Sequence, residues 1–171
     1  GRAIDAGTWT FDFPSSNINS VTTPSGRQVR YKHLYNADTS VTPWTIYEKT
    51  FFDGGTEVAR VDTTYTGVAF PVYTDWTIRV PQTQTITQGG QTFTTTYEYA
   101  ATNYGDYTRP FRITESSSSS SATRITTRAF DYAFTPYIAG KPASETVTVG
   151  TESFETQFAY EDATGFLQSA T

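Results

Sequence analysis

The stretch T-V-G-T-E-S-F-E-T-Q-F-A-Y at residues 148–160 decides the fold, because a second copy, T-Q-G-G-Q-T-F-T-T-T-Y-E-Y, stands at residues 87–99. Both copies read T-x-G-x-x-x-F-x-T-x-aromatic-x-Y. The Phe, Thr, aromatic and Tyr positions recur at every second residue, which is the side-chain period of a β-strand and places them on one face. The Gly lies in a short polar break. Each copy therefore predicts a β-hairpin.

Further units of the same kind accompany these two copies. A degenerate unit carries Phe130 and Tyr132 at the aromatic positions, and the serine tract 116–121 is its expected solvated loop. Another copy, near the N-terminus, has the order aromatic, turn, aliphatic, turn. Asp-Gly-Gly at residues 53–55 predicts a hairpin turn between two long strands in a less regular region. We therefore expect one domain or segment of tandem hairpins, with units at about 9–35, 83–112, 113–143 and 144–171 and the less regular region at 41–80.

The composition favours the same fold class, all-β. Aromatic residues make up 16% of the 171 residues, Met and Cys are absent, and threonine is abundant, which suits a half-solvated pleated surface. No window has the i, i+3, i+4, i+7 spacing of an amphipathic helix, so we predict almost no helix. Pro71 and Pro81 are expected at strand ends or on edge strands, because proline cannot donate to a ladder.

Charge and residue counts exclude several classes of function. The net charge is −5, with acids and bases interspersed, so neither a nucleic-acid partner nor insertion into a membrane is expected. His33 is the single histidine and Cys is absent, which excludes catalytic triads and clusters of His or Cys around a metal. We expect His33 to be a surface or half-buried strand residue. No catalytic residue, cofactor or metal site is predicted.

The acidic residues do not form an evident acid–base pair. Glu48 with Asp53, and Glu161 with Asp162, are the nearest pairs in sequence, but a glycosidase needs two carboxyl groups facing each other across a cleft. We expect ordinary solvated acids. A calcium site at Asp53 lacks the dense oxygen-ligand spacing of a calcium loop. The aromatic stripe could form a carbohydrate-stacking platform, but alternation at every second position favours core packing.

Several runs resemble the Tyr-Asp (YD) repeats of RHS proteins. They combine two aromatic residues with a neighbouring acid, or continue such a run: F-D-F at 11–13, Y-E-Y at 97–99, F-D-Y at 130–132, F-A-Y-E at 158–161 and G-F-L at 165–167. The run I-N-S-V-T-T-P-S-G-R at 18–27 is similar to the segment that links those repeats. The resemblance covers about 9–35 and 83–171. It departs from the pattern where Phe replaces Tyr, and the C-terminal Asp-Pro-x-Gly segment associated with self-cleavage is missing.

The resemblance implies an extended, curved sheet of short hairpins that spirals into a hollow shell, as in bacterial RHS and toxin-complex proteins and in teneurins. The expected function is then a non-enzymatic, extracellular structural or scaffold segment, in a shell wall or in a self-associating surface assembly. Its partners would be further repeats of a longer parent chain or other copies of itself. The repeat core would consist of Phe93, Tyr97, Tyr99, Phe130, Tyr132, Phe154, Phe158 and Tyr160 on one buried face.

The alternative is a bacterial surface adhesin or fibre subunit that polymerises by β-strand addition. Trp9, Phe11 and Phe13 would lie on the assembly edge, and residues 1–13 would supply a strand to a neighbouring copy. Abundant Thr, Ser and Tyr with few Lys favour a secreted or cell-surface location under either hypothesis. The chain opens at Gly1 without an initiator Met, so we expect a processed or excised segment.

Overall fold

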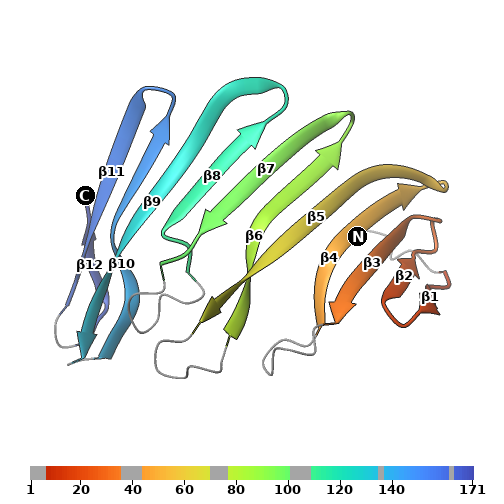
Figure 1. Cartoon of the computed structure of the whole chain (residues 1–171), viewed down its shortest axis with the longest axis horizontal. Helices are drawn as coiled ribbons and strands as arrows, with labels where there is room; N and C mark the ends of the chain where they lie inside the picture. The colour runs from red at the N-terminus through yellow and green to blue at the C-terminus, as the bar shows by residue number, and fades with distance from the viewer. Residues whose placement is uncertain (1–6, 36–43, 70–76, 101–108, 135–136, 162–163) are drawn as a thin grey trace.

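The chain forms one open antiparallel sheet. The computed structural model describes residues 7–35, 44–69, 77–100, 109–134, 137–161 and 164–171, and within them the side chains except at 35, 44, 69, 77, 131–134 and 137–140. The described residues form a sheet of 12 strands, each hydrogen-bonded to the next strand in the sequence. Figure 1 shows the strands side by side in chain order. No helix occurs in these residues, and the predicted all-β hairpin array is confirmed.

Most strands are long for a sheet, reaching 15 residues in β9, whereas strands are commonly about 5–6 residues long. Alternating threonine, aromatic and β-branched residues favour this extended backbone. The strands are β1 (Thr10–Ser15), β2 (Ile18–Thr22), β3 (Gln28–Tyr35), β4 (Trp44–Asp53), β5 (Thr56–Ala69), β6 (Thr77–Gln88), β7 (Gln91–Glu98), β8 (Arg112–Ser117), β9 (Ser120–Phe134), β10 (Tyr137–Val149), β11 (Glu152–Tyr160) and β12 (Leu167–Ala170).

The strand register gives the sheet two chemically different faces. One row of directly opposed residues crosses β5 to β11 and is almost entirely hydroxylic: Thr64, Thr83, Thr96, Thr114, Ile125, Thr148 and Ser153. We call this side the threonine face. The opposite side, the aromatic face, carries Phe11, Val21, Phe51, Val61, Ile86, Phe93, Tyr97, Ile113, Phe130, Val147, Phe154 and Phe158. The period of two in the sequence thus carries apolar side chains across the sheet. The ion pairs of Glu115 with Arg124 and of Arg128 with Glu145 lie among them on the same face.

Glycine pairs close the predicted hairpins. Gly54 and Gly55 have φ values of 56° and 81° between β4 and β5, and Gly89 and Gly90 have 58° and 76° between β6 and β7. Positive φ at both central residues is the type I′ pattern, whose twist matches the flanking strands and which glycine adopts without a Cβ clash. The hairpin predicted at residues 53–55 is confirmed.

The serine tract forms the solvated hairpin loop that the sequence predicts, but the loop is shorter than the tract. Residues 116–117 end β8 and residues 120–121 begin β9, so that residues 118–119 alone make the turn. Ser117 pairs with Ser120, and Ser118 Oγ accepts a hydrogen bond of 2.9 Å from the Thr92 amide on β7. Cross-strand pairing therefore includes most of the tract in the two strands.

Prolines inside strands lie at register shifts. Pro14, Pro81 and Pro142 stand where the pairing of β1, β6 and β10 slips by a residue. A bulge interrupts the ladder, so the missing N–H of proline costs little there. The prediction that Pro81 marks a strand end or edge is wrong, because β6 lies between β5 and β7. Pro71 lies outside the described residues.

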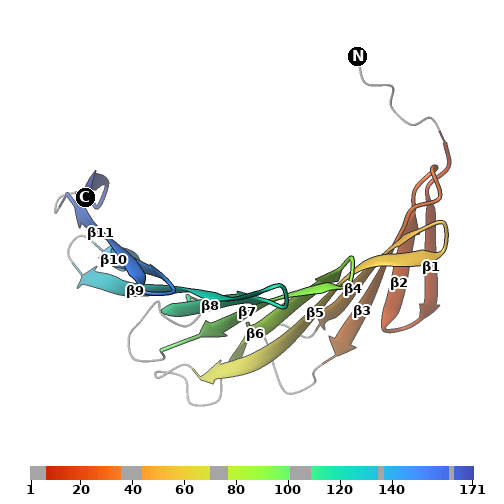
Figure 2. The same cartoon turned by 90° about the horizontal axis from the view of Figure 1, so that it is seen from above.

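The sheet is a single curved layer. Figure 2 shows that its two ends, around β1 and β12, rise toward the same side. Among the described residues, Val68 and Val80 are the buried apolar side chains, whereas domains usually bury a core between two layers. The accessible surface is 11168 Å², against about 8,400 Å² for a compact protein of this mass. The extended, curved sheet therefore leaves both faces largely uncovered.

Candidate functional site

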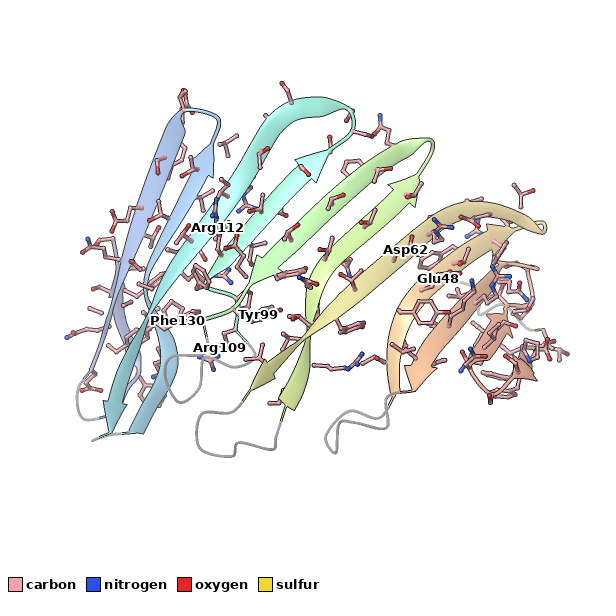
Figure 3. All side chains as sticks on the ribbon, in the orientation of Figure 1. Glu48, Asp62, Tyr99, Arg109, Arg112 and Phe130 are labelled. Carbon is pink, nitrogen blue, oxygen red and sulfur yellow. The ribbon has the colours of Figure 1, made fainter. Side chains whose placement is uncertain are left out.

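The predicted repeat residues gather on the aromatic face. Tyr97 stands opposite Ile113, and Val147 stands opposite Phe154, so the register carries one surface from β7 to β11. Alternation along their strands adds Phe93, Phe130, Phe158 and Tyr160 to it. Figure 3 shows Phe130 on β9 within this half of the sheet. The structure thus unites residues from three separate sequence units in one surface.

The prediction that this face is buried is wrong for the chain as described. Phe93 is 43% and Phe154 is 63% exposed, and Tyr97, Phe130 and Phe158 are half-buried. The physical reason is the missing second layer: alternation places a side chain on a face, but another layer has to cover that face before it becomes a core.

Two of the predicted residues need separate treatment. Tyr99 follows the last residue of β7, and its ring packs against Val68 and Val80, which the register assigns to the threonine face. Its place on the aromatic face was therefore wrongly predicted, because the alternation stops where the strand ends. Tyr132 lies on β9 with its backbone opposite Ala139, and its side chain is outside the described residues.

Three tyrosine hydroxyl groups bind carbonyl groups at bulges of the preceding strand. Tyr65 donates to the Ile46 carbonyl at 2.7 Å, Tyr99 to Pro81 at 2.8 Å and Tyr160 to Pro142 at 2.9 Å. Each acceptor lies beside a register shift, where the ladder leaves a carbonyl without its strand partner. Burial, and then the neighbouring Tyr97, raise the pKa of Tyr99 to about 12, so this hydroxyl stays protonated and donates.

Both margins of the sheet expose apolar side chains. At one margin Trp9, Phe11 and Phe13 are 53%, 64% and 70% exposed, and Phe11 stands opposite Val21 on the aromatic face. At the other margin Phe166 and Leu167 are exposed. Among the described strands β1 pairs with β2 alone and β12 with β11 alone. The predicted assembly edge is thus one of two unpaired edges, each with free backbone groups.

Glu48 is the centre of a charge cluster on the threonine face. Its carboxylate accepts hydrogen bonds from Lys32 Nζ at 2.7 Å and from the buried Thr50 hydroxyl at 2.9 Å, and Arg30 lies at 3.9 Å. Burial raises its pKa, but the bonds from Lys32 and Thr50 and the two cations outweigh burial and hold the pKa below its ordinary value. The expected solvated acid is thus wrong for Glu48, because cross-strand pairing encloses it.

This cluster does not suit acid–base catalysis. Asp62 stands directly opposite Glu48 on β5, as Figure 3 shows. Its Oδ2 atom accepts a hydrogen bond of 2.8 Å from Arg60 Nε. A general acid needs a raised pKa, whereas that of Glu48 is lowered. Asp53, which is near Glu48 in the sequence, lies 3.8 Å from Arg27. Within the described residues no group of three acidic or histidine side chains is placed to hold a metal ion.

His33 lines a shallow depression of about 300 Å³ together with Phe13, Ile18 and Asn19. Its Nε2 lies 3.2 Å from the Asn19 Oδ1 atom across the β2–β3 pair, and the side chain is half-buried, as predicted. The described lining of this depression contains no acid to act with the imidazole. The contact of His33 with Asn19 therefore connects the neighbouring strands β2 and β3.

The bulge-binding tyrosines and their acceptors were missed by sequence reasoning. A signal was available, because Pro81 precedes Tyr99 and Pro142 precedes Tyr160 by the same 18 residues. The alternating positions predict the repeat, but Pro81 is expected from the sequence at a strand end or edge, and no role is predicted for Pro142.

Comparison with known protein families, curated proteins and solved structures finds no match for this chain. The described residues contain no helix of the length and hydrophobicity that a membrane crossing requires.

Proposed function

We propose that this chain is a non-enzymatic structural segment that forms part of the wall of an RHS-like shell or part of a surface scaffold. The observation that carries the proposal is the single-layer sheet of 12 strands in the described residues, with exposed aromatic side chains on one face. An enzyme or a small-ligand carrier encloses a pocket with convergent polar groups, whereas the described residues of this sheet line shallow depressions such as the one at His33. The geometry of the sheet suits a segment that extends the sheet of a larger shell or scaffold.

The polar groups support a structural role. Arg124 and Glu115 meet at 2.8 Å, and Arg128 and Glu145 meet at 2.7 Å, in both cases across neighbouring strands. Such cross-strand pairs fix the register of a sheet. Their charges are engaged with one another, so they serve strand alignment rather than acid–base chemistry. Abundant Thr, Ser and Tyr are in keeping with a secreted or cell-surface location.

A fibre subunit that polymerises by strand addition is the second candidate. The observation in its favour is the pair of unpaired edges with exposed aromatic residues. Because the sheet has 12 strands that alternate in direction, β1 of a second copy placed beside β12 in the same orientation would run antiparallel to it. Head-to-tail addition of this kind continues without closure and builds a fibre.

Electron microscopy of the protein purified from its natural source tests both candidates, since hollow particles support the shell wall and filaments support the fibre. X-ray scattering on the isolated chain tests the shared premise of a single layer. A sheet about 55 Å across and about 33 Å along its strands has a radius of gyration of about 19 Å, against about 15.5 Å for a compact chain of this length. Compact globules in both measurements would contradict both candidates.

A further inference from the structure

The segment that contains β12 is similar in sequence to β2. β2 reads Ile-Asn-Ser-Val-Thr at Ile18–Thr22, and residues 167–171 read Leu-Gln-Ser-Ala-Thr. The preceding strands are similar as well, because Trp-Thr-Phe-Asp at 9–12 and Phe-Ala-Tyr-Glu at 158–161 stand at the same distance ahead of the two segments. Each segment pairs with the aromatic strand before it, but in a different register, since Val21 stands opposite Phe11 and Ala170 stands opposite Phe158.

The backbone phase of the two strands agrees over their last three residues. The His33 amide donates to the Asn17 carbonyl at 2.8 Å, so the N–H and C=O groups of residues 17, 19 and 21 point toward β3. Gln157 and Thr171 exchange both backbone bonds, at 2.7 and 3.0 Å, so residues 169 and 171 point toward β11. The groups of Ala170 then point outward, as those of Val21 do. At Gln168 the register shift between β11 and β12 interrupts the alternation.

The side chains that hold β3 on β2 have counterparts on β12. The Gln28 amide donates to Ser20 Oγ and Thr22 Oγ1, both at 3.4 Å, and Ser and Thr recur at 169 and 171. The Asn19 Oδ1 atom lies 3.2 Å from His33 Nε2, and Gln at 168 offers the same carboxamide group. Val21, opposite Val29, is replaced by the smaller Ala at 170, which leaves room for an aliphatic partner.

We propose that the outer edge of β12 is an acceptor site for a strand of the β3 type. Such a strand carries Gln, an aliphatic residue, Arg, an aromatic residue, Lys and His in the order of Gln28–Tyr35, and it binds antiparallel by β-augmentation. The proposal rests on the proposed structural role and deepens it, because it names the partner that extends the sheet. β1 of a second copy, Thr-Phe-Asp-Phe-Pro-Ser, is a poorer occupant, since it offers neither the glutamine nor the histidine.

A chain extended by a second copy of residues 23–35 directly after Thr171 tests the proposal. Amide hydrogen exchange of Ala170, followed by NMR, is expected to slow by at least roughly 10-fold, toward the rate of Val21 in the same sample. The Ser169 amide faces β11 and is the internal control, with an unchanged rate. The matched control tail carries proline at its counterparts of Val29 and Tyr31, because these residues donate across the β2–β3 pair; it should give no slowing.

The side-chain part of the proposal is tested in trans. A synthetic peptide of residues 26–35 should slow hydrogen exchange of the Ala170 amide in the unextended chain. The Ser169→Val and Thr171→Val double variant should bind this peptide roughly 3- to 10-fold more weakly, because a neutral hydrogen bond contributes about 1 kcal/mol.

Three results would overturn the proposal. Equal exchange rates with the native and the proline-bearing tail would show that β12 accepts no such strand. Slowed exchange without any tail or peptide, abolished by Phe11→Pro, would show that β1 of a second copy occupies the edge and would support the fibre. Fast exchange at Asn19 and Val21 themselves would show that the sheet is not formed, which contradicts the proposed function as well.

Discussion

Replacing Glu48 with glutamine is expected to lower the free energy of unfolding by about 2–3 kcal/mol at pH 7. The Glu48 side chain is 11% exposed, and it binds Lys32 at 2.7 Å and Thr50 at 2.9 Å. Removing one partner of a buried ion pair costs about 3–5 kcal/mol; the 28% exposure of Lys32 lowers this figure, because water solvates the stranded cation. Glutamine keeps the shape of the side chain, so packing is preserved and the loss reports the charge.

Urea unfolding of the parent and the variant at several pH values measures this effect. The pKa of Glu48 is lowered from its ordinary value of 4.5 in the folded chain. Its stabilisation is therefore complete above that ordinary value and is lost as the pH falls through the folded-state pKa. The two proteins should converge in strong acid.

The matched control for this experiment is Glu115→Gln. Glu115 also forms a 2.8 Å ion pair, with Arg124, but both side chains are exposed, so its loss should be below about 1 kcal/mol. Equal losses in the two variants, or a loss at Glu48 that does not change with pH, would refute the enclosed charge cluster.

Tyr160→Phe should cost about 1 kcal/mol in urea unfolding, because it removes the bond to the Pro142 carbonyl at 2.9 Å and keeps the ring; no loss would contradict that bond. Phe154→Ala should cost below about 1 kcal/mol, since the ring is 63% exposed, whereas half-buried Phe158→Ala should cost about 1–2 kcal/mol; a reversed order would show that a second layer covers Phe154. Gly89→Ala should lower the thermal midpoint by the equivalent of about 1–2 kcal/mol, because its φ is +58°; an unchanged midpoint would argue against the type I′ turn.

The hairpins and their faces could be predicted from the sequence because both are local properties. The period of two around Phe93 and Tyr97 needs no knowledge of the rest of the chain, and Gly54 with Gly55 accepts a turn that few other residues adopt. The repeated stretch likewise indicated that the hairpins follow one another, and sequential strands do pair throughout the described sheet.

The candidate site could be predicted in part. Phe154, Phe158 and Phe130 share a face as the alternation indicates, but their exposure depends on what lies above the sheet, which no local pattern contains. Glu48 shows the same limit for charge. Its partner Lys32 is 16 residues away, and the strand register brings the two together, so the spacing of the acids in the sequence could not show that Glu48 is enclosed.

The sequence by itself determined that this chain is an array of β-hairpins whose repeated aromatic residues share a face, because side-chain alternation and turn chemistry act within a few residues. The tertiary structure decided that the array stays a single curved layer, as Figure 2 shows, and that prolines occupy bulges inside it. It also decided that, among the described strands, β1 and β12 each have a strand partner on one side only. These features depend on register and on contacts between distant strands, which are set when the strands meet and not within any one of them.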